Sequence, residues 1–189
     1  MQFFIKIILL LTFLIKTAQA GFYFQHSFHY GSDADDVENL ESTAMRNISF
    51  LGAGFGDNGR WIVGQSIILS NKEYKNDSMT STSSLSLLEL GPRIQYYFNQ
   101  NKTVYISGAY NFYAKGDREQ DGQSQKVSGT SMFFNLGIQS RISKKFYFGL
   151  SLNYHTVSID ESTVETTQST VSHSYTFIYP AVEFSLRFK

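Results

Sequence analysis

The residues best suited to chemistry in this 189-residue chain are its four histidines: His26, His29, His155 and His173. A histidine acts as a catalytic base only when a nucleophile lies within hydrogen-bonding distance. Ser32 follows His29 by three positions, and Ser158 follows His155 by three. Neither spacing predicts a catalytic pair, and we expect all four histidines to make ordinary hydrogen bonds.

Two other motifs resemble ligand sites only in part. The glycine-rich stretch 52–59 resembles a dinucleotide-binding loop, but no strand–helix–strand unit surrounds it, so we interpret it as a turn. The acidic segment 31–42 begins like a calcium loop at Asp33 and Asp35, but Ala44 stands where the bidentate glutamate belongs. The chain has no cysteine, which removes thiolate ligands and disulfides. We predict no metal site and no cofactor.

A third group of chemically distinctive residues consists of charged side chains at alternate positions, on the more polar face of several strand-like runs. Its members are Glu89, Arg93, Arg141, Lys145, Glu183 and Arg187. Charges this numerous are unusual in the core of a soluble sheet sandwich. Desolvated charges need partners, so we predict a salt bridge between Arg93 and Glu183, extended by Glu89 and Arg141.

The elements that carry these residues are β-strands, and the clearest is 175–188. Val182, Phe184, Leu186 and Phe188 alternate there with polar residues, a period of two typical of a strand with one apolar face. Eight such runs occur, at 22–30, 43–54, 60–70, 88–98, 104–112, 132–139, 145–155 and 175–188.

Two runs have less clear faces, and two prolines interrupt the pattern. In the second run we assign Ile48 and Phe50 to the apolar face; in the third, isoleucines occur on both faces. Pro92 and Pro180 fall inside strands, where a missing N–H breaks a ladder bond. We expect local bulges at both prolines.

Connections of alternating length join these runs. Long polar connections are expected at 31–42, 71–83, 115–125 and 160–171, and short ones at 55–59, 99–101 and 143–144. Antiparallel strands joined in this way gather every long loop at one end, as in outer-membrane barrels. Lipid cannot satisfy an open sheet edge, so the eight strands must close. The sequence predicts an all-β, closed, eight-stranded antiparallel up-and-down transmembrane barrel.

Composition and the first residues are consistent with this fold. Aromatic residues make up 16% of the chain, and the formal net charge of zero argues against a nucleic-acid partner. Residues 1–20 have the pattern of a secretory signal peptide, with Lys6 before the apolar run 7–15 and Ala18-Gln19-Ala20 at the cleavage positions. That run is too short to span a bilayer. We predict a barrel domain over 21–189.

The secretory segment, the eight alternating runs, the loop rhythm and the Val182-x-Phe184-x-Leu186-x-Phe188 pattern resemble the small outer-membrane barrel family that includes OmpA transmembrane domains and OmpX. The resemblance implies that the outer-membrane assembly machinery reads this last strand, although Lys189 follows the usual final aromatic. It also implies the outer membrane of a Gram-negative-type bacterium, with both termini periplasmic. The acidic first loop would then bind lipopolysaccharide phosphates through divalent ions.

A fold shared by adhesins, enzymes and inert anchors does not define a function. We expect a protein that is not an enzyme, with a lumen filled by charged and polar residues. Its role would be structural, or its four long connections would contact a surface partner. One alternative is a narrow channel or small-ligand conduit, and another is a soluble periplasmic barrel of lipocalin type. A lipid-modifying enzyme is a third, but His155 lacks the His-x-Ser spacing of such barrels.

Overall fold

The fold was analysed in a computed structural model that describes residues 21–33, 40–56, 59–76, 82–120, 122–164 and 167–188. Eight strands account for nearly all of these residues. They are β1 (Phe22–Asp33), β2 (Leu40–Phe55), β3 (Trp61–Asn76), β4 (Thr82–Tyr97), β5 (Val104–Gln120), β6 (Gln123–Arg141), β7 (Phe146–Val164) and β8 (Thr167–Arg187). No helix among the described residues is long and apolar enough to cross a membrane.

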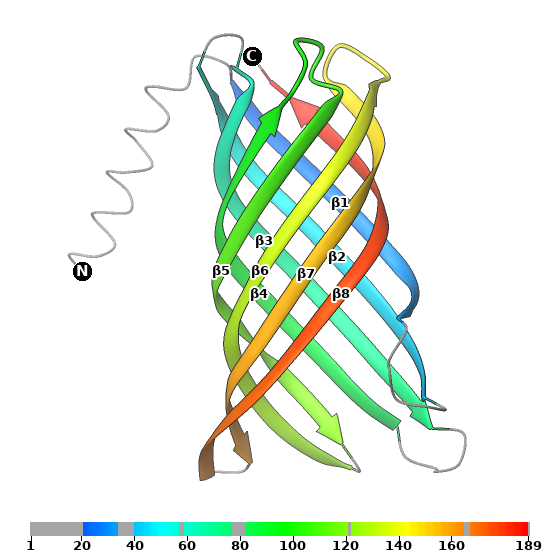
Figure 1. The fold of residues 1–189 in the computed structure, drawn as a ribbon, viewed down its shortest axis with the longest axis vertical. Helices are drawn as coiled ribbons and strands as arrows, with labels where there is room; N and C mark the ends of the chain where they lie inside the picture. Colours follow the sequence, from blue (N-terminus) through cyan, green and yellow to red (C-terminus); the bar gives the residue numbers. More distant parts are fainter. Residues whose placement is uncertain are drawn as a thin grey trace, which may run out of the picture.

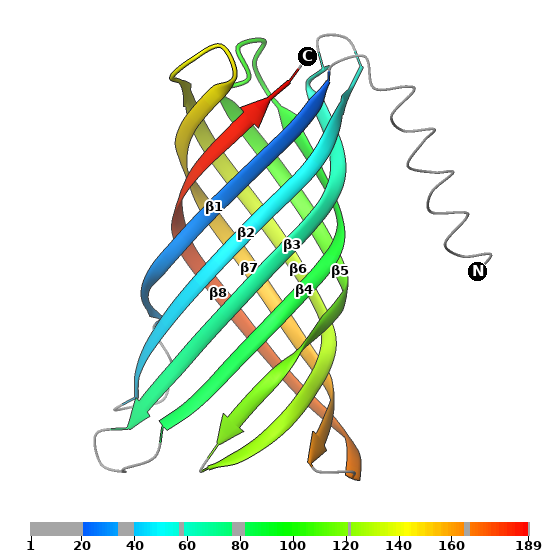
Figure 2. The same ribbon diagram turned by 180° about the vertical axis from the view of Figure 1, so that it is seen from behind.

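The strands form one closed ring in sequence order, and every neighbouring pair is antiparallel. β1 and β8 close the ring through a short ladder that runs from Tyr23–Arg187 to Phe28–Val182. Gly21 and Phe188 lie at the same end of the barrel, which we call the terminal end (Figure 1). The opposite end, formed by the longer hairpins, is the hairpin end (Figure 2). The predicted fold class is confirmed.

Away from the bulges, side chains alternate between the inside and the outside of this wall, because successive residues of a strand point to opposite faces. On β7, Leu150 and Leu152 are 61% and 54% exposed, whereas Ser151 and Asn153 are buried. On β8, Val182 is exposed and Glu183 is buried. The exposed apolar side chains form a belt around the barrel. This belt excludes the lipocalin-type alternative, which requires the apolar face to point inward.

Aromatic side chains border the belt at both edges. Phe22 and Phe188 are in contact at the terminal end, with ring centroids 6.2 Å apart, and Trp61 packs on Tyr96 at 4.5 Å. Tyr30 is 69% exposed toward the hairpin end of β1. Rings at both edges of an apolar belt are typical of the two interfaces of a membrane.

Three of the predicted long connections are mostly strand. β3 and β4 extend to Asn76 and from Thr82, β5 and β6 enclose only residues 121–122, and β7 and β8 enclose only 165–166. The prediction of loops at 71–83, 115–125 and 160–171 is therefore wrong. Serine, threonine and glutamine continue the ladders there without the apolar alternation that marks the belt, so the sequence pattern ended before the strands did. Within the first connection, residues 34–39 lie outside the described residues.

The face assignment of the second run is also wrong. Ile48 and Phe50 are fully buried inside the barrel, while Asn47 and Ser49 occupy outward positions on β2. The two apolar residues fill space beside interior side chains of other strands, as members of two apolar clusters. A short apolar stretch does not show by itself whether it faces the interior or the outside of the barrel, because apolar side chains occur on both faces of the wall.

The two prolines behave differently. Between the pairs Leu90–Tyr113 and Arg93–Ala109, β5 has three residues opposite two on β4, so the bulge expected at Pro92 is present. At Pro180 the β7–β8 register continues without a shift. The expected bulge is absent there, and the ladder between β1 and β8 instead ends two residues away, at Val182. His29 Nδ1 lies 2.7 Å from the Pro180 carbonyl oxygen, which replaces a ladder contact at that point.

Candidate functional site

The interior near the terminal end is organised around the carboxylate of Glu183. This β8 side chain is fully buried and accepts hydrogen bonds from Tyr105 Oη (2.5 Å), Gln25 Nε2 (2.8 Å) and Gln139 Nε2 (2.8 Å). Ser27 Oγ lies at 3.5 Å. The donors come from β1, β5 and β6 and carry no charge. A buried carboxylate can thus be satisfied by neutral donors alone, provided that several converge on it.

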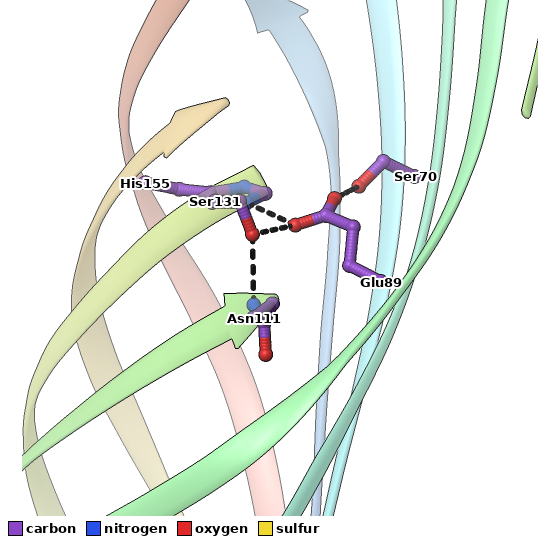
Figure 3. Close-up of polar contacts among 5 residues, drawn as sticks. All are labelled: Ser70, Glu89, Asn111, Ser131 and His155. Carbon is purple, nitrogen blue, oxygen red and sulfur yellow. Dashed lines mark hydrogen bonds and ion pairs between the residues drawn. The ribbon is translucent and has the colours of Figure 1, made fainter. Parts of the chain in front are cut away.

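Glu89 forms a second carboxylate cluster (Figure 3), on the hairpin side of Arg93 along β4. Its side chain is fully buried, and His155 Nε2 lies 2.8 Å from Glu89 Oε2. Ser70 Oγ donates to Oε1 at 3.1 Å, and Ser131 Oγ donates to Oε2. Asn111 Nδ2 in turn donates to Ser131 Oγ at 2.8 Å. This cluster ties together five strands, β3 to β7, through one acidic group.

Arg93 lies between these clusters and is held by aromatic rings. Its guanidinium carbon is 4.7 Å from the centroid of Phe50 and 5.1 Å from that of Phe133, and Nε donates to Ser107 Oγ at 3.1 Å. Nη1 and Nη2 make no hydrogen bond within the described part of the chain. The predicted Arg93–Glu183 salt bridge is therefore wrong. Each charge has found its own partners, because a ring face stabilises a desolvated cation without a second charge.

Arg46 and Arg187 repeat this arrangement at other heights. The Arg46 guanidinium lies 4.3 Å from the Phe177 centroid and 4.4 Å from that of Tyr179. Arg187 stacks on Tyr147 at 3.5 Å, and its Nη2 donates to Tyr97 Oη, the Lys102 carbonyl and Gln139 Oε1 at 2.9, 3.0 and 2.7 Å. Aromatic rings thus hold three interior arginines.

Two of the predicted interior charges lie elsewhere. Arg141 and Lys145 are exposed beside the β6–β7 turn at the terminal end, and Arg141 Nε donates to the Ser143 carbonyl at 3.0 Å. Placing them in the lumen, and extending the Glu183 cluster through Arg141, is wrong. Arg141 and Lys145 lie at the mouth of the barrel, beyond its buried interior, so even a side chain on the inner face of the wall is exposed to solvent there.

The side chains that fill the remaining interior were not singled out from the sequence. Inside the barrel, next to the terminal opening, Tyr23, Tyr97 and Tyr105 pack as a layer with Phe50 and Ile62. A further cluster of Leu85, Leu87, Val127, Val157 and Ile159 occupies the hairpin half. Leu85, Leu87 and Tyr97 lie on β4 with the parity of Glu89 and Arg93, so counting by twos from those charges could have identified these three. The other residues lie on strands that carry none of the charges Glu89, Arg93 and Glu183.

Two cavities lie toward opposite ends of the barrel. One of about 1340 Å³ opens at the terminal end and reaches down to Tyr97 and Arg187, with a rim that includes Lys102, Arg141 and Lys144. The other, in the hairpin half, measures about 30 Å³, which is room for a few waters at most. Between them lie Arg93, Tyr105, Phe133 and His155, each at most 1% exposed.

Among the described interior residues the geometry does not assemble a catalytic pair, whereas on the lipid-facing side His26 Nδ1 lies 3.0 Å from Ser49 Oγ. His155 contacts Glu89, and Ser131 also bonds to Glu89, so within the cluster no serine hydroxyl is directed at the imidazole. His29 contacts the Pro180 carbonyl. The described residues contain no group of three or more His, Asp or Glu side chains able to hold a metal ion. Of the acidic candidates, Asp35, Asp36 and Glu38 fall outside the described residues. Gly56 and Gly59 form a turn with positive φ angles of 74° and 56°, as expected.

Comparison with known proteins decides the family. A family model described as "Outer membrane protein beta-barrel domain" matches residues 9–177. The chain belongs to this outer-membrane barrel family. It is therefore an outer-membrane protein, and its exposed apolar belt faces lipid. No curated protein sequence matches the chain.

One solved structure supports the fold of this outer-membrane barrel. The crystal structure of Neisserial surface protein A (NspA) is similar with a TM-score of 0.50 and 14% identity, covering 89% of this chain and 98% of that one. The beta domain of the Bordetella autotransporter BrkA has a TM-score of 0.46 and 8% identity, covering 90% of this chain and 99% of that domain. At such identities the similarity to NspA concerns the fold alone.

Proposed function

We propose that this outer-membrane barrel is a structural and surface-exposed protein with a sealed interior, and that it is neither a channel nor an enzyme. The observation that carries the proposal is the plug of buried side chains between the two end cavities, in particular the Glu183 and Glu89 clusters. An eight-stranded barrel is just wide enough for side chains to fill its interior. Each carboxylate of the plug bonds to three or more strands, so opening a path would break several bonds at once.

The proposal predicts that the purified barrel does not conduct ions. In a planar bilayer at high salt, the folded protein should give no unitary current steps above the baseline of protein-free membranes. A porin reconstituted in the same way is the positive control. Reproducible steps that disappear when the protein is heat-unfolded before addition would contradict the sealed interior and support a conduit.

We further propose that both termini face the periplasm and that the hairpin end faces outward. The support is that Gly21 and Phe188 lie at one end of the ring and the long β5–β6 and β7–β8 hairpins lie at the other, which matches the orientation of bacterial outer-membrane barrels. The extended hairpins, within the segments 31–42, 71–83, 115–125 and 160–171, would then contact lipopolysaccharide or an extracellular partner. The Val182, Phe184, Leu186 and Phe188 face of β8 would serve as the assembly signal.

Because the chain has no cysteine, a single introduced cysteine can report which side of the membrane each end of the barrel faces. Gln123→Cys lies in the β5–β6 hairpin and Ser143→Cys in the β6–β7 turn, and both positions are exposed. A membrane-impermeant maleimide added to whole cells should label the first variant and leave the second unlabelled until the outer membrane is permeabilised. The reverse pattern would show that the hairpin end faces the periplasm.

A further inference from the structure

The lipid-facing side of β1, β2 and β3 carries a polar patch that the sealed interior does not explain. The patch consists of His26, Asn47, Ser49 and Gln65, all at outward strand positions. His26 lies midway along β1 between the belt-edge rings of Phe22 and Tyr30, and it pairs across the ladder with Ser49. Gln65 pairs with Leu51 one strand further on. The patch therefore lies at the middle of the belt, where hydrocarbon surrounds the barrel.

The opposite side of the ring has no such residues at the corresponding positions. On β6, which lies four strands from β2 in the ring, the outward side chains are Met132, Phe134, Leu136 and Ile138, and each is at least 50% exposed. On β7 they are Phe148, Leu150, Leu152 and Tyr154. The polar side chains are thus confined to one flank of the belt.

Bonds within the patch satisfy it only in part. His26 Nδ1 lies 3.0 Å from Ser49 Oγ, and the Asn47 side chain interacts with the same ring. Gln65 Nε2 donates to the Ser66 carbonyl at 3.2 Å. Gln65 is exposed on the lipid-facing side of β3. Polar groups in hydrocarbon are costly unless they find partners, and they promote association of membrane segments.

We propose that the β1–β3 flank is the interface of a homodimer, with two copies related by a two-fold axis along the membrane normal. Imidazole, amide and hydroxyl groups each donate and accept hydrogen bonds and here need no counter-charge, so the patch can pair with an identical patch. A lipid headgroup does not reach mid-belt depth, which favours a protein occupant. The outward residues Ala53 and Ser49 on β2 are small, so a second copy of the barrel can approach the β2 backbone closely between the bulkier side chains of β1 and β3.

Cross-linking of the full-length mature barrel tests this dimer. Leu51→Cys lies beside the patch and keeps all four of its residues, and Leu136→Cys on β6 is the matched control on the far flank; both side chains are exposed. Each variant is reconstituted into phosphatidylcholine vesicles over a series of lipid-to-protein ratios and oxidised with copper phenanthroline. The Leu51→Cys dimer should form at about tenfold lower protein density than the Leu136→Cys dimer. Equal cross-linking of the two variants at every ratio would overturn the proposal.

A second variant shows whether the patch itself drives association. Replacing His26, Asn47 and Gln65 together by leucine in the Leu51→Cys background should lower the dimer yield to that of Leu136→Cys. Unboiled gel mobility checks that this variant is folded, and outward apolar residues are expected to be tolerated in lipid. Undiminished cross-linking of the folded triple variant would overturn the proposal, because it would show that the polar groups are not the contact.

Discussion

Replacing Glu183 by leucine is expected to destabilise the folded barrel by about 3 to 5 kcal/mol, the range for removing one partner of a buried charged network. The carboxylate is the common acceptor for Tyr105, Gln25 and Gln139, and all three donors are fully or almost fully buried. Leucine leaves them without an acceptor at a depth that water does not reach. The free energy of unfolding is measured by urea titration in lipid vesicles, followed by the fluorescence of Trp61, the only tryptophan.

The matched control for this change is Glu161→Leu on β7. Glu161 is exposed and accepts a hydrogen bond from the half-buried Ser128, so its replacement should change the free energy of unfolding by less than about 1 kcal/mol. If both substitutions had equally small effects, the Glu183 cluster would not stabilise the barrel. Glu183→Gln should fall between the two, because its amide can still accept from part of the donor set but presents N–H groups to the rest.

Replacing Gly137 by alanine should cost about 2 to 4 kcal/mol, through overpacking and the disturbance of a buried hydrogen bond. A Cβ at Gly137 would lie 2.3 to 2.4 Å from two ring carbons and the hydroxyl oxygen of Tyr105, much closer than side-chain atoms approach. Tyr105 cannot move aside freely, because its hydroxyl group is bonded to Glu183 and Gln25 in the plug. The same vesicle titration measures the effect.

Gly108→Ala on β5 is the control for Gly137→Ala. Its new Cβ would lie 3.3 Å from the outward Phe134 ring, which can rotate into lipid, and at an ordinary contact distance of 3.9 Å from the Phe133 carbonyl oxygen. Its cost should be below about 1 kcal/mol. A double-mutant cycle adds a second check: in a Tyr105→Ala background, Gly137→Ala should be nearly neutral. An unchanged penalty in that background would show that the strain arises elsewhere than at the tyrosine ring.

The strand order and the closed ring could be predicted from the sequence because lipid and lumen impose opposite requirements on alternate residues. Where both requirements were met, as on β7 from Phe148 to Tyr154, the pattern was strict and the prediction correct. β2 failed because Ile48 and Phe50 are interior residues while Ser49 and Asn47 face lipid, a reversal that local alternation cannot detect. That reversal is also what reveals the patch.

The pairing of interior charges could not be predicted for a different reason. Opposite charges on facing walls suggested an Arg93–Glu183 bridge, but contact depends on strand stagger and on which side chains intervene. Phe50 and Phe133 lie against Arg93, and Gln25 and Gln139 reach Glu183. Ring faces therefore contact the Arg93 guanidinium and neutral donors bind the Glu183 carboxylate, so the two charges do not meet.

The most direct test of the account is the depth at which the outer side chains lie. In a Trp61→Phe background, a tryptophan at Leu150, which is 61% exposed in the middle of the belt, should be quenched strongly by lipids brominated deep in their acyl chains. Aqueous acrylamide should quench it weakly. A tryptophan at Gln123 in the β5–β6 hairpin should show the opposite preference. Strong acrylamide quenching at position 150, with no effect of brominated lipid, would contradict the placement of the apolar belt in the membrane.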